Sequence, residues 1–523
     1  MPDNTDSTTS YDAVPYPSHP YPQTHPERLA TVAGLFGADP CPIGQCRVLE
    51  VGCGQGGNLL PMAEQLPESR FVGIDLSDVQ IDAAQRRADE AGLTNIELRR
   101  LDILDVTADL GEFDYILCHG VYSWIPPHVQ NSLLALCSAR LSPHGVAYVS
   151  YNTYPGWHLR EMIRSMMRYH ARGFPDPGEH VAQARALLDF LAGAVDANDD
   201  VYGPMLRREL NLLRRLSDSY LFHEHLESFN APIYFHQFAE RAADNGLQYL
   251  GEAQVAAMYT GNLPADVERT LRSVASDLVQ MEQYMDFVRN RAFRQTLLVH
   301  QDIEVDRRLR ADRLEDMYVS SPLTCDESNG SVGATRYSRR DDDRSMSTGD
   351  PLLKAAIARL AAAWPGSVAH RQLVVDSDPE LGPGAVTTAD RIARTAERLA
   401  RGLLKLYMAD LVEFHCAPDR FVTAVSDFPR AGGVARSQAA AGAVVTNRRH
   451  ESVEIDELGR RVLRNLDGTR DRHAILDRLQ ALVDDGVLVI RQDSQSPTDA
   501  RPRLTDALDQ TLKALAARAL LVE

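Results

Sequence analysis

The stretch that most restricts the fold of this chain is residues 47–58, RVLEVGCGQGGN. An apolar run typical of a strand carries an acid, Glu50, and is followed by glycines at alternate positions, Gly52, Gly54 and Gly56. Glycine tolerates the tight backbone needed where a strand turns directly into a helix. The stretch therefore predicts an open α/β sheet that binds a nucleoside cofactor beyond the carboxyl end of this strand.

The glycine spacing alone does not identify the cofactor. Gly52, Gly54 and Gly57 also fit the G-x-G-x-x-G pattern of dinucleotide-binding proteins, which is weak when it stands alone. A dinucleotide needs a helix N-terminus free for its pyrophosphate, whereas S-adenosylmethionine carries an ammonium and a sulfonium that favour nearby carboxylates. Glu50 lies two residues before the first glycine, where it can hold the amino acid end of that cofactor.

Two further acids follow predicted strands. Asp75 ends the run FVGID, at a distance along the chain typical of a ribose-binding acid. Asp102 stands beside Ile103, so an acid can accept from an adenine amino group while an apolar side chain packs on the ring; alternatively, Asp102 only caps a loop. Three acids in this order favour a methyltransferase over a dehydrogenase. The predicted cofactor-binding residues are Glu50, Gly52, Cys53, Gly54, Gly56, Asn58, Asp75, Leu76, Asp102, Ile103 and His119.

The segment 40–172 alternates strand and helix patterns, which predicts a mostly parallel, Rossmann-like sheet with helices on both faces. Strands are expected near 47–51, 70–75, 95–101, 113–118 and 145–151. The methyl acceptor should meet the cofactor at the loops after the fourth and fifth strands, which are rich in aromatic residues. The candidate catalytic or acceptor-positioning residues are His119, Tyr122, Trp124, Tyr16, Tyr151 and Asn152. Trp124 could instead only cover the end of the sheet, and His119 could be a cofactor contact.

Residues 1–39 read as an N-terminal arm. Three tyrosines, Tyr11, Tyr16 and Tyr21, alternate with prolines, and a helix is expected from about Pro26. Such an arm could close over the cofactor as a lid, with the ring of Tyr16 facing the methyl donor. The alternative is that the tyrosines simply anchor the terminus.

Length and charge exclude several classes of protein. With 523 residues the chain is too long for one core and suggests several domains. A net charge of −18 argues against a general nucleic-acid binder, because neutralising phosphates needs a basic face. The first ten residues resemble no targeting signal, and no apolar run is long enough to span a membrane. We expect a cytoplasmic protein.

Two groups of residues could suggest metal ligands. Residues 223–227, HEHLE, contain two histidines and two glutamates, but the spacing is H-E-H and not the H-E-x-x-H of zinc proteases. Cys41 and Cys46 lie close together, but no second cysteine pair completes a zinc site. We expect no metal.

The rest of the chain divides by composition. Residues 173–318 are predicted to form a mostly helical middle domain, and 319–350, rich in Ser, Gly, Asp and Arg, a flexible linker. Residues 351–426 have helices followed by short strands, as in a winged helix, and 427–523 a small C-terminal domain. Arg391, Arg394, Arg398 and Arg401 would form a basic stripe if DNA were the partner, but protein docking or dimerisation suits the acidic chain better.

Several segments together resemble a known family. YDAVPYPSHP, VLEVGCGQGGN, HGVYSWIP and SYNTYPGWHLREMIRSMM resemble the class I S-adenosylmethionine methyltransferases that carry a methyltransferase regulatory domain, a group that includes the rickettsial protein lysine methyltransferases. Residues 223–254 and 282–300 resemble the middle domain of that family, and LDGTRDRHAILDRL resembles a pattern near its C-terminus. The resemblance covers most of the chain.

The resemblance implies a protein methyltransferase that acts on lysine amines and is dimeric, without specifying the substrate protein. The competing hypothesis is a small-molecule methyltransferase whose C-terminal half is a lid or dimer platform. A third is a binding protein that keeps the cofactor fold without catalysis, and the intact acids at Glu50, Asp75 and Asp102 argue against it.

Overall fold

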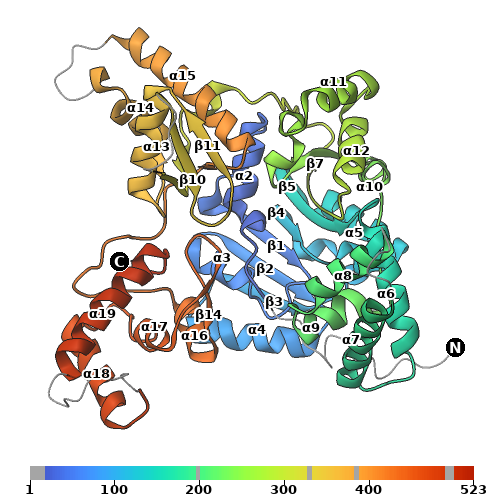
Figure 1. The fold of residues 1–523 in the computed structure, drawn as a ribbon, viewed down its shortest axis with the longest axis horizontal. Helices are drawn as coiled ribbons and strands as arrows, with labels where there is room; N and C mark the ends of the chain where they lie inside the picture. Colours follow the sequence, from blue (N-terminus) through green and yellow to red (C-terminus); the bar gives the residue numbers. More distant parts are fainter. Residues whose placement is uncertain (1–17, 196–200, 327–332, 382–387, 489–499, 523) are drawn as a thin grey trace.

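The computed structural model describes residues 18–195, 201–326, 333–381, 388–488 and 500–522. Its centre is a seven-stranded sheet in the order β3-β2-β1-β4-β5-β7-β6 (Figure 1). The five strands β3, β2, β1, β4 and β5 are parallel to one another, whereas β7 is antiparallel to both β5 and β6. The strands are β1 (Arg47–Val51), β2 (Arg70–Asp75), β3 (Ile96–Arg100), β4 (Phe113–Cys118), β5 (Leu141–Asn152), β6 (Leu247–Glu252) and β7 (Phe293–His300). The five predicted strands are therefore confirmed.

Both faces of this sheet are buried, because neighbouring residues of a strand contribute to different cores. On β1, Val48 belongs to one apolar cluster and Leu49 to another, and on β4, Tyr115 and Ile116 divide in the same way. This pattern explains why the strands read as nearly continuous apolar runs. The helices that flank these strands in the sequence are α2 (Pro26–Leu35), α3 (Leu59–Gln65), α4 (Asp78–Ala91) and α5 (Pro127–Arg140).

The middle region is helical but also completes the sheet. β6 and β7 come from within 173–318, so the prediction of a mostly helical domain missed two strands. Both are short apolar runs between helices, and periodicity alone does not distinguish such runs from helix. The helices are α6 (Trp157–Ala171), α7 (Pro177–Ala194), α8 (Tyr202–Leu213), α9 (Asp218–Leu221), α10 (Phe235–Asp244), α11 (Ala265–Val274) and α12 (Leu278–Arg289), and one π-helical turn is η6 (Phe222–Leu226).

The stretch 319–350 is not an unstructured linker in its described part. It contains β9 (Leu323–Cys325), β10 (Thr335–Arg339) and β11 (Ser345–Thr348), which form one sheet, and most of β8 (Tyr318–Ser320). β8 pairs with β12 (Val368–Ala369) and β13 (Glu413–His415). The strands of this stretch bury few side chains, so its composition resembles that of a linker. One partner of β8, β13, is about 95 residues away in the sequence, so no local pattern indicates the pairing.

The remaining helices form two groups beyond the sheet. The first is α13 (Pro351–Ala363), α14 (His370–Ser377) and α15 (Ala389–Met408). The second has its own apolar core and comprises α16 (Gly433–Ala441), β14 (Val444–Thr446), β15 (Ser452–Glu454), α17 (Glu457–Leu463), α18 (Arg472–Asp484) and α19 (Ala500–Ala517). In Figure 1 the second group, in orange and red, lies beside α3 and α4, and Val434 of α16 packs with Leu60 and Ala88.

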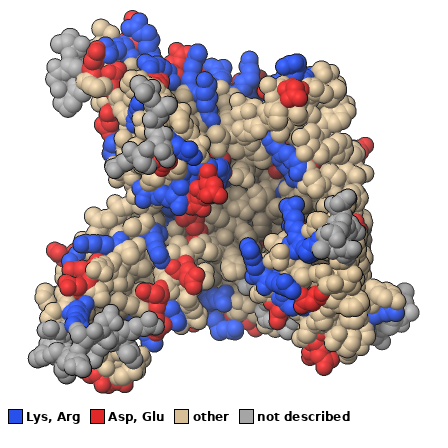
Figure 2. All heavy atoms as spheres, viewed as in Figure 1, with Lys and Arg blue, Asp and Glu red and all other residues tan. Residues whose placement is uncertain are grey.

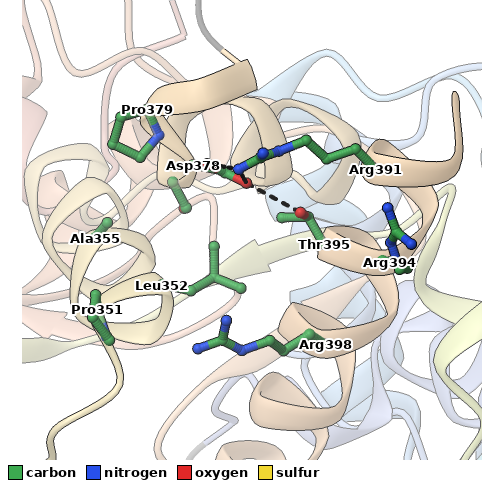
Figure 3. Close-up of a pocket in the computed structure, with 10 residues that line it drawn as sticks. Pro351, Leu352, Ala355, Asp378, Pro379, Arg391, Arg394, Thr395 and Arg398 are labelled. Carbon is green, nitrogen blue, oxygen red and sulfur yellow. Dashed lines mark hydrogen bonds and ion pairs between the residues drawn. The ribbon is translucent and has the colours of Figure 1, made fainter. Parts of the chain in front are cut away.

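The predicted basic stripe on α15 is largely offset by acids. Arg391 pairs with Asp378, Arg398 with Asp350 and Arg401 with Glu397. Arg391, Arg394 and Arg398 line a pocket of about 490 Å³ between α13, α14 and α15 (Figure 3). The paired guanidinium groups leave a weaker positive surface than the arginine spacing suggests.

Candidate cofactor site

The glycine-rich turn after β1 adopts the backbone that its sequence predicts. Gly52, Gly54 and Gly56 have φ angles of +75°, +52° and +73°, a region that other residues rarely adopt. A Cβ on Gly52 would lie 2.5 Å from Cγ2 of Val121, in the loop after β4. Backbone conformation therefore favours glycine at these three positions, and close packing also excludes a side chain at Gly52.

Glu50 is buried near the end of β1, with only 3% of its surface exposed. Its Oε1 accepts a hydrogen bond of 2.7 Å from Nδ2 of Asn58, while its Oε2 is buried without a hydrogen-bond partner. Burial raises the pKa of Glu50 to about 8, although the hydrogen bond from Asn58 opposes this. A buried acceptor without a partner is costly. The ammonium of S-adenosylmethionine supplies both the donor and the charge that Oε2 lacks, so this residue fits the cofactor.

Asp75 connects the end of β2 to the glycine-rich turn. Its Oδ2 accepts from the backbone N–H of Gly54 at 2.9 Å, and its Oδ1 from that of Ser77 at 3.0 Å. A carboxylate offers about four acceptor positions, so these bonds orient it without exhausting it. Its role in binding ribose hydroxyls stays a prediction.

Apolar side chains border Asp75. Leu76 is 50% exposed and Ile103 is partly buried, so both have surface on which an adenine ring can pack. Asp102 caps the 3-10 turn η3 (Ile103–Asp105), because its Oδ1 accepts from the backbone N–H of Leu104 at 2.9 Å. The capping alternative is therefore realised, and a contact of Asp102 with adenine stays a prediction. Cys53 is buried beneath the turn.

The N-terminal arm runs over the glycine-rich turn in its described part. Ser18 Oγ accepts from the backbone N–H of Gly57 at 2.6 Å, and the backbone N–H of Tyr21 donates to Oδ1 of Asn58 at 2.9 Å. The ring of Tyr21 lies 3.8 Å from that of His119, centroid to centroid. Tyr16, predicted to face the methyl donor, lies outside the described residues.

His119 follows β4 directly and lies under Tyr21. Its Nδ1 is 2.9 Å from the hydroxyl of Tyr148 and 3.3 Å from that of Ser150. Burial lowers the pKa of His119 to about 4, so the ring is neutral near pH 7. This environment suits a cofactor contact better than a general base.

Two predicted acceptor residues are in the core and not on the rim. Tyr122 and Tyr151 are at most 1% exposed and pack against Phe238 of α10. The hydroxyl of Tyr151 pairs with Thr296 at 3.0 Å. Sequence analysis missed this because β5 extends to Asn152 and α10 covers the two rings.

Trp124 and Asn152 stay candidates for contacting an acceptor. Trp124 is partly exposed, and the guanidinium carbon of Arg164 lies 5.7 Å from its ring centroid. The side chain of Asn152 is buried, and its Nδ2 has no hydrogen-bond partner. An amide donor of this kind can position a polar group of an acceptor.

The site also contains residues that sequence analysis did not select. Tyr21 belongs to the tyrosine-proline arm, in which only Tyr16 was predicted to face the methyl donor. Thr24 and His450 contact Asn58, and no local pattern marks either of them. His450 in particular is brought to the site only by the docking of the C-terminal group.

Among the described residues, no group of three or more His, Cys, Asp or Glu side chains is arranged to hold a metal ion. In the HEHLE segment, Nδ1 of His223 is paired with Oε1 of Glu227 at 3.2 Å. Within the same described ranges, no helix is long and apolar enough to cross a membrane.

Comparison with known proteins places this site in a family. Three family models match the chain: a methyltransferase domain at residues 48–145, a predicted methyltransferase regulatory domain at 217–300, and the C-terminal winged helix domain of PKMT at 427–520. The uncharacterized protein RP789 of Rickettsia prowazekii is 34% identical over 98% of this chain and 93% of its own length. The chain belongs to the S-adenosylmethionine-dependent methyltransferases with a regulatory domain.

Solved structures agree with this family. PKMT2 of Rickettsia typhi aligns with a TM-score of 0.85 and 31% identity, over 97% of this methyltransferase and 100% of PKMT2. The complex of PKMT2 with AdoHcy, the demethylated cofactor, aligns with a TM-score of 0.86. The cofactor of this methyltransferase is S-adenosylmethionine. The winged helix model matches residues 427–520. None of these three family models covers residues 351–426, whose winged-helix-like fold stays a prediction.

Proposed function

We propose that this methyltransferase methylates lysine side chains of a protein substrate. The observation that carries the proposal is the correspondence with PKMT2 over nearly the whole of both chains, including the domains beyond the cofactor fold. A dimeric state and a cytoplasmic location are part of the same proposal.

The shape of the molecule supports a large substrate. Figure 2 shows a broad hollow at the centre of one face, between the region of α13–α15 and the region of α6–α8. A small-molecule methyltransferase gains from a closed pocket, since closure excludes water and fixes the acceptor. An open hollow instead leaves room for a polypeptide.

The chemistry divides between the cofactor and this chain. The bound cofactor supplies an electrophilic methyl group with a good leaving group, so the protein must align the acceptor and present its amine uncharged. Glu50 holds the ammonium of the cofactor, Asp75 holds the ribose, and the apolar surface of Leu76 and Ile103 takes the adenine. Trp124 and Asn152 border the place of the acceptor.

A lysine ammonium must lose a proton before it can attack. Glu224 of η6 is a candidate acceptor for that proton, because burial raises its pKa to about 7, partly opposed by Arg160 and Arg164. A base is most effective when its pKa lies near the working pH. Arg164, one of the two arginines that oppose this rise, also lies against the ring of Trp124, which borders the proposed place of the acceptor.

The test is incubation of the purified protein with labelled S-adenosylmethionine and a lysate of its host. We expect label in a protein band, and mass spectrometry of that band should find methyl groups on lysine. Gly54→Arg, which places a bulky side chain on the glycine-rich turn, should remove the label. Label confined to small metabolites would instead favour the small-molecule alternative.

A further inference from the structure

The turn between β14 and β15, residues 447–451, reaches from the C-terminal group into the cofactor domain. His450 is 2% exposed, and its Nε2 donates to Oδ1 of Asn58 at 2.8 Å. Asn58 is the residue that also donates to Glu50. His450 and Asn58 are 392 positions apart in the sequence. Their hydrogen bond thus ends on the residue that donates to Glu50, the carboxylate proposed to bind the ammonium of the cofactor.

The turn is anchored on both sides of the contact. Nη1 of Arg448 pairs with Oε2 of Glu64 on α3 at 3.3 Å. Nη2 of Arg449 pairs with Oε2 of Glu413 on β13 at 2.6 Å, and its guanidinium lies over the ring of Trp364. Two ion pairs to two different parts of the molecule therefore hold the turn in place.

The backbone of the turn has an uncommon conformation at His450, the residue that makes the contact. His450 has a φ of +61°, in the left-handed region that is uncommon for residues other than glycine. Asn447 stabilises this conformation, because its Oδ1 accepts from the backbone N–H groups of Arg449 and Glu451, both at 2.9 Å. An unfavourable backbone is kept where the structure around it determines the conformation.

The contact fixes the orientation of the Asn58 amide. Oδ1 of Asn58 accepts from His450, from Oγ1 of Thr24 at 3.2 Å and from the backbone N–H of Tyr21. Nδ2 therefore faces Glu50 and Thr24, at 2.7 Å and 3.0 Å. A flipped amide would point N–H groups at the N–H donors of Tyr21 and His450 and would leave Oε1 of Glu50 facing a carbonyl oxygen.

We propose that His450 is a positioning residue for the amino acid end of S-adenosylmethionine, acting through Asn58 and Glu50. The C-terminal domain thereby completes the cofactor site. His450 does not touch the cofactor; it holds the amide that engages one oxygen of Glu50, which leaves the other oxygen for the ammonium. The adenosine end depends on Asp75 and its neighbours and is independent of this turn.

The two ends of the cofactor can be tested separately by calorimetry on the full chain. S-adenosylhomocysteine carries the amino acid end, and 5′-methylthioadenosine lacks it. For His450→Ala we expect the Kd of S-adenosylhomocysteine to rise about tenfold, while that of methylthioadenosine changes less than about twofold. His450→Gln, which keeps an N–H donor, should recover part of the loss. His473→Ala, at an exposed position on α18, is the matched control.

A purely structural role predicts a different pattern. If His450→Ala weakened both ligands equally, or neither, the proposal would be overturned. Arg449→Met offers a second route that leaves Asn58 and His450 intact: it removes an anchor of the turn and should produce the same selective loss. Equal loss of both ligands in Arg449→Met would also contradict the proposal, and it keeps the test decisive if His450→Ala does not fold.

Discussion

Asn58 and Glu50 are joined by a hydrogen bond of 2.7 Å that engages Oε1 of the carboxyl group, while Oε2 is buried without a partner. This arrangement suits the binding of a cation, because Oε1 is held by Asn58 and Oε2 has no partner within the protein. Burial raises the pKa of Glu50 to about 8, so the carboxyl group is largely protonated near pH 7 before the cofactor binds. The ammonium of the cofactor should then displace this proton.

Binding of S-adenosylhomocysteine near pH 7 should therefore release close to one proton from Glu50. The physical reason is that a neighbouring positive charge lowers the pKa of a carboxyl group. Calorimetric titrations in buffers of different ionisation enthalpy measure the number of protons released. Glu50→Gln should abolish both the release and most of the binding; an unchanged proton release in that variant would assign it to another group.

The same substitution should change how stability depends on pH. The folded pKa of Glu50 lies above its unfolded value of about 4.5, so its contribution to stability is present below pH 4.5 and is lost as the pH rises through 8. Glu50→Gln removes this loss, and its Tm should exceed that of the parent by a margin that grows up to about pH 8 and is constant above. Thermal unfolding without cofactor at several pH values checks this. A constant margin from pH 5 to 9 would contradict the shifted pKa.

Two substitutions of Tyr21 should show how much its ring and its hydroxyl each contribute to cofactor binding. The ring lies 3.8 Å from that of His119 and covers the end of β4. Tyr21→Ala should weaken cofactor binding by about tenfold, because it exposes His119 and removes an apolar cover, whereas Tyr21→Phe should retain nearly all binding. Calorimetry with S-adenosylhomocysteine decides the outcome. A loss of equal size in both variants would mean that the hydroxyl matters.

Glu224 should control the acidic limb of the pH–rate profile. If Glu224 accepts the lysine proton, kcat rises with pH up to about 7 in the parent enzyme, where the carboxylate becomes ionised. Glu224→Gln should lower kcat by about a hundredfold and remove that limb. Glu179→Gln, at an exposed position on α7, is the control. A parallel downward shift with the same limb would assign the limb to another residue.

The buried arginine on β7 should be essential for stability. Arg294 is fully buried and pairs with Glu252, Glu282 and Asp286. Arg294→Met removes the central partner of three buried acids and leaves them only the ion pairs with Arg291, at 3.2 to 4.0 Å. It should lower the free energy of unfolding by about 3 to 5 kcal/mol. Arg272→Met, which breaks a surface pair on α11, should have little effect. Denaturant titration measures both, and a small effect of Arg294→Met would show that the pairs with Arg291, or protonation of the acids, replace Arg294 at little cost.

Local sequence predicted where the strand-end acids and the glycine-rich turn of the candidate cofactor site lie. The strand with Glu50, the positive-φ glycines and Asp75 are each set by neighbouring residues, because a tight turn after a parallel strand needs glycine and a cofactor ammonium needs a carboxylate. The predictions that were wrong concern residues whose packing neighbours are distant in the sequence. Tyr122 and Tyr151 were expected on the rim, yet α10 covers them.

The sequence by itself determined the cofactor fold, its order of strands along the chain and the identity of the methyl donor. Only the tertiary structure decided that β6 and β7 close the sheet, that the stretch 319–350 forms strands in its described part, and that His450 lies against Asn58. The physical reason is that turns and strand-end acids are short-range features of the chain, whereas strand partners and docked domains depend on burial between segments hundreds of residues apart. Such burial leaves no pattern in either segment alone.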